Sequence, residues 1–193
     1  MIGRLTKGKV VVFMKKKVKN FAYIDGANLY MGVSRAEWVL DYARFRVWLR
    51  EKHGVTHAYL FLGLVPKYKD LYTKLQEAGF TLVFKETVYD DKGKPKGNCD
   101  ADLVLHAVRD VFESDMERAV LVSSDGDYAS TVKFLDERKK FEAIISPHPK
   151  ERCSILLKRT NVPITYLNDI RPLVESSKEK APGADKTAQG SSS

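Results

Sequence analysis

The chain has little cysteine and no long apolar run, and each shortage excludes a class of protein. Only two of its 193 residues are cysteines, Cys99 and Cys153, and neither has the nearby cysteine or histidine that a structural zinc site needs. We expect both thiols to be reduced, as in a cytoplasmic protein. The five apolar residues 10–14 precede three lysines and are too few for a secretory core or a membrane span. The sequence therefore predicts neither export nor membrane insertion.

Acidic residues are absent from residues 1–20, and this absence makes the charge uneven. The segment contributes +7 of the net +8, and residues 175–193 sum to zero with three basic and three acidic residues, which leaves about +1 between them. The basic residues of the arm are Arg4, Lys7, Lys9, Lys15, Lys16, Lys17 and Lys19. Such an arm binds a polyanion by displacing counterions, or it is only a solvated leader. The composition leaves both interpretations open.

Length and composition indicate one folded domain with two extensions. A chain of 193 residues with 44% hydrophobic and 30% charged residues is typical of a single globular domain. We divide it into a basic arm at 1–20, a domain at 21–174 and a tail at 175–193. From Ser176 onward the tail has almost no apolar content, so we expect it to be disordered.

Short apolar runs alternate with longer amphipathic segments from residue 21 onward. Strands are expected at 21–24, 55–62, 80–88, 119–122, 141–145 and 164–167. Helices are expected from the cap Asp41 to near Gly54, and at 66–78, 100–112, 128–139 and 151–159. This alternation predicts an α/β domain of three layers with a mostly parallel central sheet, as in Rossmann-like folds.

The expected helix at 100–112 is strongly amphipathic. A step of about 100° per residue collects an apolar face, which consists of Ala101, Val104, Leu105, Val108, Val111 and Phe112. Asp100 lies at the edge of this face. The opposite polar face consists of Asp102, His106, Arg109 and Glu113. We therefore expect Asp100 to point inward and Asp102 to be solvated or to support the site indirectly, while His106 needs no functional explanation.

Aspartates follow the ends of expected strands in two places and open the helix at 100 in a third. Asp25 follows the first strand, and Asp125 and Asp127 follow the strand at 119–122. Because ligands collect at the carboxyl ends of parallel strands, these acids and Asp100 are candidates for one site. Together they would repel one another unless a divalent cation neutralised them, and carboxylate oxygens suit Mg²⁺ or Mn²⁺. The alternatives are a common Asp-Gly turn at Asp25 and a helix cap at Asp127.

Other side chains are candidates for supporting roles. Asn28 offers an amide that can orient a ligand or water, and Ser123 can hydrogen-bond a carboxylate or a phosphate oxygen. Lys92, Lys94 and Lys96, in a loop rich in glycine and lysine, are candidates for binding phosphates, as are Lys15, Lys16 and Lys17 of the arm, although exposed lysines are often only solvated. Tyr23, Tyr30 and Tyr128 can stack on bases, although aromatic residues beside strands more often belong to the core.

Three blocks of this sequence, in this order, resemble the blocks of the NYN domain family, a branch of the PIN-like nucleases. They are Phe-Ala-Tyr-Ile-Asp-Gly-Ala-Asn-Leu-Tyr at 21–30, Lys-Gly-Asn-Cys-Asp-Ala-Asp-Leu-Val-Leu at 96–105 and Val-Leu-Val-Ser-Ser-Asp-Gly-Asp-Tyr at 120–128. The resemblance extends over about residues 21–169. The chain departs from the pattern at His106, where many relatives have an aspartate.

The resemblance implies a metal-dependent ribonuclease that binds Mg²⁺ or Mn²⁺ and hydrolyses RNA. It implies that the metal-site acids are Asp25, Asp100, Asp125 and Asp127, with Asn28 and Ser123 as helpers. A first alternative is an RNA-binding or adaptor module with a non-catalytic pocket. A second is a phosphatase with Asp25 as nucleophile, but the acid that such enzymes carry two residues later is replaced by Ala27. The oligomeric state and any protein partner stay open.

Overall fold

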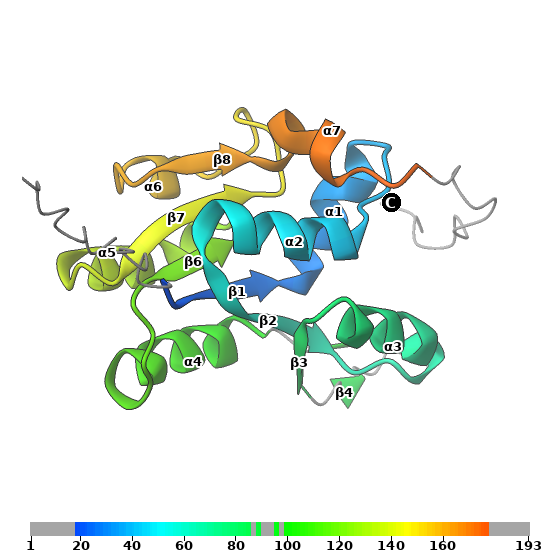
Figure 1. Ribbon diagram of the computed structural model, residues 1–193, viewed down its shortest axis with the longest axis horizontal. Helices are drawn as coiled ribbons and strands as arrows, with labels where there is room; N and C mark the ends of the chain where they lie inside the picture. The colour runs from blue at the N-terminus through cyan, green and yellow to red at the C-terminus, as the bar shows by residue number, and fades with distance from the viewer. Residues whose placement is uncertain (1–17, 86–87, 90–94, 97–98, 178–193) are drawn as a thin grey trace, which may run out of the picture.

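Six parallel strands form the central sheet of the domain. The computed structural model describes residues 18–85, 88–89, 95–96 and 99–177. The strands lie in the order β3-β2-β1-β6-β7-β8, and every adjacent pair is parallel (Figure 1). Their bounds are β1 (Asn20–Asp25), β2 (Val55–Gly63), β3 (Thr81–Lys85), β6 (Ala119–Val122), β7 (Phe141–Ser146) and β8 (Ile164–Tyr166). A separate antiparallel pair is formed by β4 (Val88–Tyr89) and β5 (Pro95–Lys96).

Helices cover both faces of this sheet, which confirms the predicted three-layer fold. The first face packs against α1 (Gly26–Arg35), α2 (Tyr42–His53), α3 (Lys69–Glu77) and α7 (Arg171–Val174). The second packs against α4 (Asp100–Glu113), α5 (Ala129–Glu137) and α6 (Ile155–Lys158). Three short 3-10 helices are η1 (Pro66–Tyr68), η2 (Gly126–Tyr128) and η3 (Leu167–Ile170). In β1, Ala22 and Ile24 enter the first core, whereas Phe21 and Tyr23 enter the second, as strand alternation requires.

The strand order places a topological switch point between β1 and β6. From β1 the chain continues to β2 and β3 on one side, and from β6 it continues to β7 and β8 on the other. Adjacent strands whose connections leave in opposite directions open a crevice at their carboxyl ends, where ligands bind in open α/β sheets. Asp25 ends β1, and the segment 123–127 follows β6, so the predicted acids lie at this crevice.

Most expected elements are present, with differences at their ends. The strand at 119–122 has the expected bounds, and α2 has the expected caps: Asp41 accepts from the Arg44 N–H, and Gly54 adopts φ +64°. The third strand ends at Lys85 rather than at residue 88, and the last predicted helix shortens to Ile155–Lys158. Helix α1 was not predicted, because its sequence begins with an Asp-Gly pair typical of a turn.

The predicted apolar face of α4 was wrong in part, although Val104 and Val111 do pack against the second core. Its buried residues are Leu103, Ala107 and Asp110, whereas Leu105 and Phe112 are 66% and 69% exposed. The buried stripe includes a carboxylate because Asp110 accepts hydrogen bonds from the Tyr23 hydroxyl (2.9 Å) and the Arg109 guanidinium (3.1 Å). A polar group that is fully paired can be buried at little cost. The predicted apolar face did not include Asp110 and is rotated away from the buried stripe.

Residues just outside the predicted domain bounds of 21 and 174 make contacts with the domain. The Lys19 carbonyl accepts from the Glu117 N–H at 2.9 Å, and Asn20 opens β1. At the other end Glu175 forms an isolated bridge with Leu40. The remaining residues of the predicted arm and tail, 1–17 and 178–193, lie outside the described residues.

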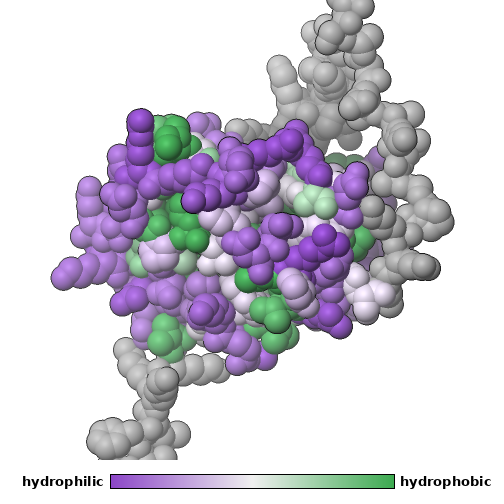
Figure 2. All heavy atoms as spheres, turned by 90° about the horizontal axis from the view of Figure 1, so that it is seen from above, coloured by the Kyte–Doolittle hydropathy of each residue, from purple (hydrophilic) through white to green (hydrophobic). Residues whose placement is uncertain are grey.

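Among the described residues, no helix combines the length and the apolar character needed to cross a bilayer. On the face seen in Figure 2, hydrophobic residues form small separate patches among hydrophilic ones. Cys99 and Cys153 are both free thiols.

Candidate metal centre

Each of the candidate aspartates is placed by the beginning of a helix. Asp25 caps α1, and its Oδ1 accepts from the Asn28 N–H at 3.0 Å. Asp125 caps η2 in the same way and accepts from the Asp127 N–H at 3.1 Å. Asp100 is the first residue of α4, where the helix dipole favours a negative charge. Strand ends and helix starts thus bring four distant aspartates to the switch point.

Three of the four carboxylates lie within reach of one ion. Asp100, Asp125 and Asp127 each offer an oxygen, and these oxygens lie within 4.8 Å of one another. An all-carboxylate donor set fits a hard divalent cation such as Mg²⁺ or Mn²⁺. Asp25 is not in this group of three. The structure thus groups three of the predicted acids and places Asp25 beside them, and the binding of one metal by all four stays a prediction.

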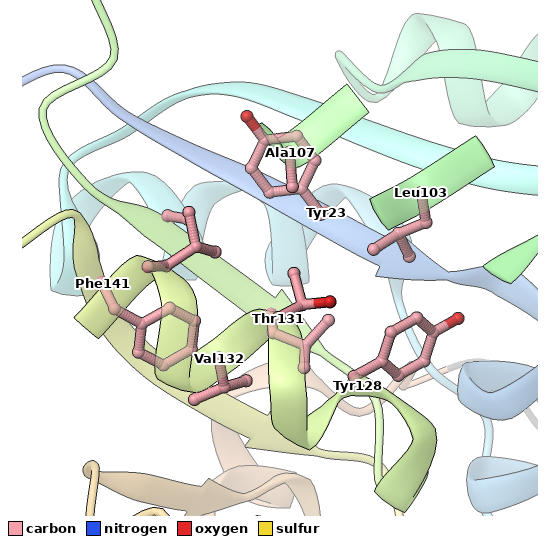
Figure 3. Close-up of a pocket in the computed structure, with 10 residues that line it drawn as sticks. Tyr23, Leu103, Ala107, Tyr128, Thr131, Val132 and Phe141 are labelled. Carbon is pink, nitrogen blue, oxygen red and sulfur yellow. The ribbon is translucent and has the colours of Figure 1, made fainter. Parts of the chain in front are cut away.

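The Tyr128 hydroxyl connects Asp25 to this group. It lies 2.5 Å from Asp100 Oδ1 and 3.3 Å from Asp25 Oδ2, so a single proton serves two carboxylates. In Figure 3 the Tyr128 ring lies near Leu103, and its hydroxyl points away from Val132 and Phe141. Burial, followed by the charges of the two aspartates, raises the pKa of Tyr128 far above its ordinary value. The hydroxyl is therefore a permanent donor at neutral pH.

Asp25 accepts hydrogen bonds from one backbone N–H and from two hydroxyl groups. Besides the Asn28 N–H, it faces the Ser123 hydroxyl, which lies 3.4 Å from Oδ2. Burial raises the pKa of Asp25, and the nearby Asp100 adds to the rise, against hydrogen bonds that lower it. Ser123 also accepts from the Asp125 N–H at 3.2 Å, so one buried hydroxyl joins both strand ends.

A buried polar network holds the loop after β6, and of its members only Asn28 was predicted from the sequence. Asn28 Oδ1 accepts from the Ser124 N–H at 2.9 Å, which ties α1 to this loop. Ser124 Oγ lies 2.9 Å from Ser146 Oγ and accepts from the His148 N–H at 3.1 Å. Ser124, Ser146 and His148 are all buried. No spacing in the sequence joins residues 124, 146 and 148; only the adjacency of β6 and β7 does.

The other predicted residues that the structure describes are not part of the group of three carboxylates. Asp102 forms an ion pair with Lys85 at 3.2 Å and is 44% exposed at its side chain. Lys92, Lys94, Lys15, Lys16 and Lys17 fall outside the described residues, and Lys96 is described only as part of β5. His106 packs its ring against Tyr59 and Phe61, with centroids at 5.4 and 5.5 Å, so its role is packing. Tyr23 and Tyr128 are core residues, whereas Tyr30 is 61% exposed.

A cleft of about 520 Å³ opens beside the acids. Asp25, Asp100 and Asp125 line one part of it, and α1, the end of β2 and the segment from Val65 to Leu75 line the rest. Its volume lies within the range of small-molecule sites, about 300–1,000 Å³. The candidate metal centre is therefore open to a substrate along a continuous cleft.

Comparison with known proteins places this architecture in a family. The model of the NYN domain matches residues 21–179. A crystal structure of a protein of unknown function from Vibrio parahaemolyticus superposes with a TM-score of 0.66 and 21% identity, covering 83% of this chain and 98% of the other. No curated protein matches the chain. Since the family model spans most of the sequence and the fold agrees, the chain belongs to the NYN domain family, a family of PIN-like ribonucleases.

Proposed function

We propose that this protein is a metal-dependent ribonuclease that hydrolyses RNA phosphodiester bonds at the switch-point acids. The observation that carries the proposal is the group of three carboxylate oxygens within 4.8 Å at the carboxyl edge of a parallel sheet. Membership in a nuclease family supports the same reading. Charge repulsion supports the need for a cation, because three adjacent carboxylates destabilise one another unless their charge is neutralised.

Each group of residues has a proposed role that follows from its position. Asp100, Asp125 and Asp127 would hold Mg²⁺ or Mn²⁺. Such an ion, when bound, activates water for in-line attack and stabilises the leaving oxygen. Asp25 completes the acidic wall and is kept in place by Asn28, Ser123 and Tyr128. Lysines of the arm and of the 90–97 loop are the proposed phosphate contacts.

The proposal is tested by cleavage of labelled RNA in Mg²⁺, Mn²⁺ or EDTA, with structured and unstructured substrates. We expect cleavage only when metal is present. We expect Asp125→Asn to slow cleavage at least ~100-fold, because loss of a residue that only supports a metal ligand already costs up to about 100-fold. Asp115→Asn is the matched control, because Asp115 is an exposed acid paired with Lys19. Metal-dependent cleavage that survives Asp125→Asn would refute the site.

The same assay separates the two alternatives. Metal-independent binding of RNA without cleavage would indicate an adaptor module with a non-catalytic pocket. A phosphatase using Asp25 is disfavoured because both oxygens of Asp25 already accept hydrogen bonds, Oδ1 from Asn28 and Oδ2 from Ser123 and Tyr128. Absence of a covalent phosphoenzyme would agree with that argument.

A further inference from the structure

The cleft beside the acids is lined by two chemically different kinds of side chain. One kind is the carboxylates of Asp25, Asp100 and Asp125. The other kind is apolar and aromatic side chains, among them Tyr30, which is 61% exposed, and Tyr68, which is 45% exposed. A ligand that fills the cleft must therefore join an anionic group, held through a cation, to a planar or apolar group. A nucleotide has both parts.

Contacts of Tyr72 hold in place the turn that carries Tyr68. The Tyr72 hydroxyl lies 3.0 Å from the Val65 N–H and 3.3 Å from the Gly63 carbonyl, which holds the turn between β2 and η1. The Tyr72 ring packs edge to face on Phe84 at 4.9 Å. Tyr68 extends from this turn, and Tyr30 extends from α1, the helix that Asp25 caps. The backbone segments that carry both exposed rings are therefore fixed relative to the acids.

A cation lies beside one of these rings. The Lys67 Nζ is 5.0 Å from the centroid of the Tyr68 ring. A positive charge next to an exposed aromatic ring suits a strand of nucleic acid, because the charge attracts the phosphate while the ring stacks on the base. An apolar peptide would gain nothing from the lysine.

We propose that Tyr30 and Tyr68 form a stacking subsite for an unpaired nucleobase next to the phosphodiester held at the acids. The inference rests on the proposed function and adds to it a base-binding element and a preference for single strands. A base within a duplex is stacked on its neighbours and cannot enter the cleft without being extruded. Stacking accepts any base, since each has a π face, so little sequence preference is expected.

The test measures binding of a labelled single-stranded oligoribonucleotide by fluorescence anisotropy in Mg²⁺, with phosphorothioate linkages that resist hydrolysis, so that the cation is present while cleavage is suppressed. Tyr30→Ala and Tyr68→Ala should each weaken binding roughly 5- to 150-fold, the equivalent of about 1–3 kcal/mol for one stacked base. Tyr30→Trp should retain affinity, whereas Tyr30→Leu should not, because leucine is apolar but not planar. Phe112→Ala is the control, an exposed aromatic residue on α4 outside the cleft.

A substrate series with one abasic nucleotide at each position completes the test. At the position that enters the cleft, the abasic substitution should weaken wild-type binding. It should have little further effect in the double variant Tyr30→Ala/Tyr68→Ala, because the variant and the abasic substitution remove the same contacts. Additive losses, unchanged affinity in Tyr30→Ala, or no RNA binding by the wild type would overturn the subsite. A change of oligomeric state in Tyr30→Ala without a change in RNA affinity would assign the cleft to a protein contact instead. Failure of cleavage with intact stacking would count against the nuclease and not against the subsite.

Discussion

At the scale of single residues, the Tyr128 hydroxyl is the one group that contacts both Asp25 and Asp100 in the described hydrogen bonds. It lies between Asp100 and Asp25, at 2.5 and 3.3 Å, while its ring is buried in the core. Two carboxylates that share one donor proton are held close without a positively charged partner in the hydrogen bond. The hydroxyl lowers the pKa of Asp25 against the burial that raises it, so it favours the ionised form that a cation needs.

Tyr128→Phe should therefore impair the metal centre while leaving the fold intact. The ring still fills its place in the core, and the freed carboxylates can be hydrated from the cleft, so we expect a loss of about 1 kcal/mol in the free energy of unfolding. Mn²⁺ affinity, measured by calorimetry, and the cleavage rate should each fall about 10- to 100-fold. Tyr166→Phe, which removes a hydroxyl at the far edge of the sheet, is the control. Full Mn²⁺ affinity in Tyr128→Phe would contradict the role given to the hydroxyl.

His53 makes stability depend on pH. The side chain is 8% exposed, and its Nδ1 lies 3.8 Å from Glu142 Oε1, too far for a hydrogen bond. Burial lowers the pKa of His53 below its ordinary 6.5, although Glu142 opposes the shift. As the pH falls below about 6.5 the unfolded chain takes up the proton first, so the stabilisation present above that pH is lost on acidification.

Denaturant unfolding between pH 5 and 7.5 should show this loss. His53→Phe keeps a ring against Trp48 and removes the titration, so the decline in unfolding free energy should become shallower by at most ~1.4 kcal/mol per pH unit. His57→Gln, at an exposed histidine in β2, should leave the decline as it is in the wild type. Equal slopes for wild type and His53→Phe would show that His53 does not carry the effect.

At the scale of elements, α4 shows what periodicity can and cannot predict. The existence and start of the helix at Asp100 follow from the sequence, and Glu113 ends it one residue beyond the expected position. Its orientation does not follow, because Asp110 is buried against Tyr23 of β1 and accepts a hydrogen bond at 2.9 Å. The contact joins residues 87 positions apart, so no local pattern contains it.

Asp110→Ala tests how α4 is fixed to the sheet. The change leaves the buried Tyr23 hydroxyl without its carboxylate acceptor, and we expect the unfolding free energy to fall by about 1–3 kcal/mol. Asp110→Asn keeps an acceptor oxygen and should lose less. Thermal and denaturant unfolding of the two variants measure the difference. Equal losses in both would show that the charge, and not the hydrogen bond to Tyr23, holds the helix.

At the scale of the whole molecule, the sequence predicted the layers and the edge where the acids gather, but not their grouping. Strand–helix alternation implies a parallel sheet, and acids after strands then share its carboxyl edge. The order β3-β2-β1-β6-β7-β8 comes from long-range pairing, and it is what makes β1 and β6 neighbours. Which three carboxylates converge depends on the turn at η2 and on Tyr128, both settled only by packing.

The charge distribution leads to a prediction about the whole chain. Residues 1–17 carry six of the basic residues and no acid, while the candidate site is acidic. If the arm contacts the substrate backbone, each contact with a single strand contributes about 0.7 to the slope of log affinity against log salt. Changing Arg4, Lys7, Lys9, Lys15, Lys16 and Lys17 to glutamine should therefore reduce that slope by up to ~4.

The control for the arm changes the opposite end of the chain. Lys178, Lys180 and Lys186 belong to the tail, where acidic residues balance them, so their replacement by glutamine should alter the slope little. RNA affinity measured by anisotropy across a salt series distinguishes the two sets. An arm that serves only solubility predicts equal slopes for the wild type and the arm variant. A reduced slope with an unchanged cleavage rate at saturating RNA would show that the arm captures the substrate and that the proposed chemistry stays with the aspartates. Salt screens exposed charges, such as those of the arm, far more than it would screen a cation held by three carboxylates.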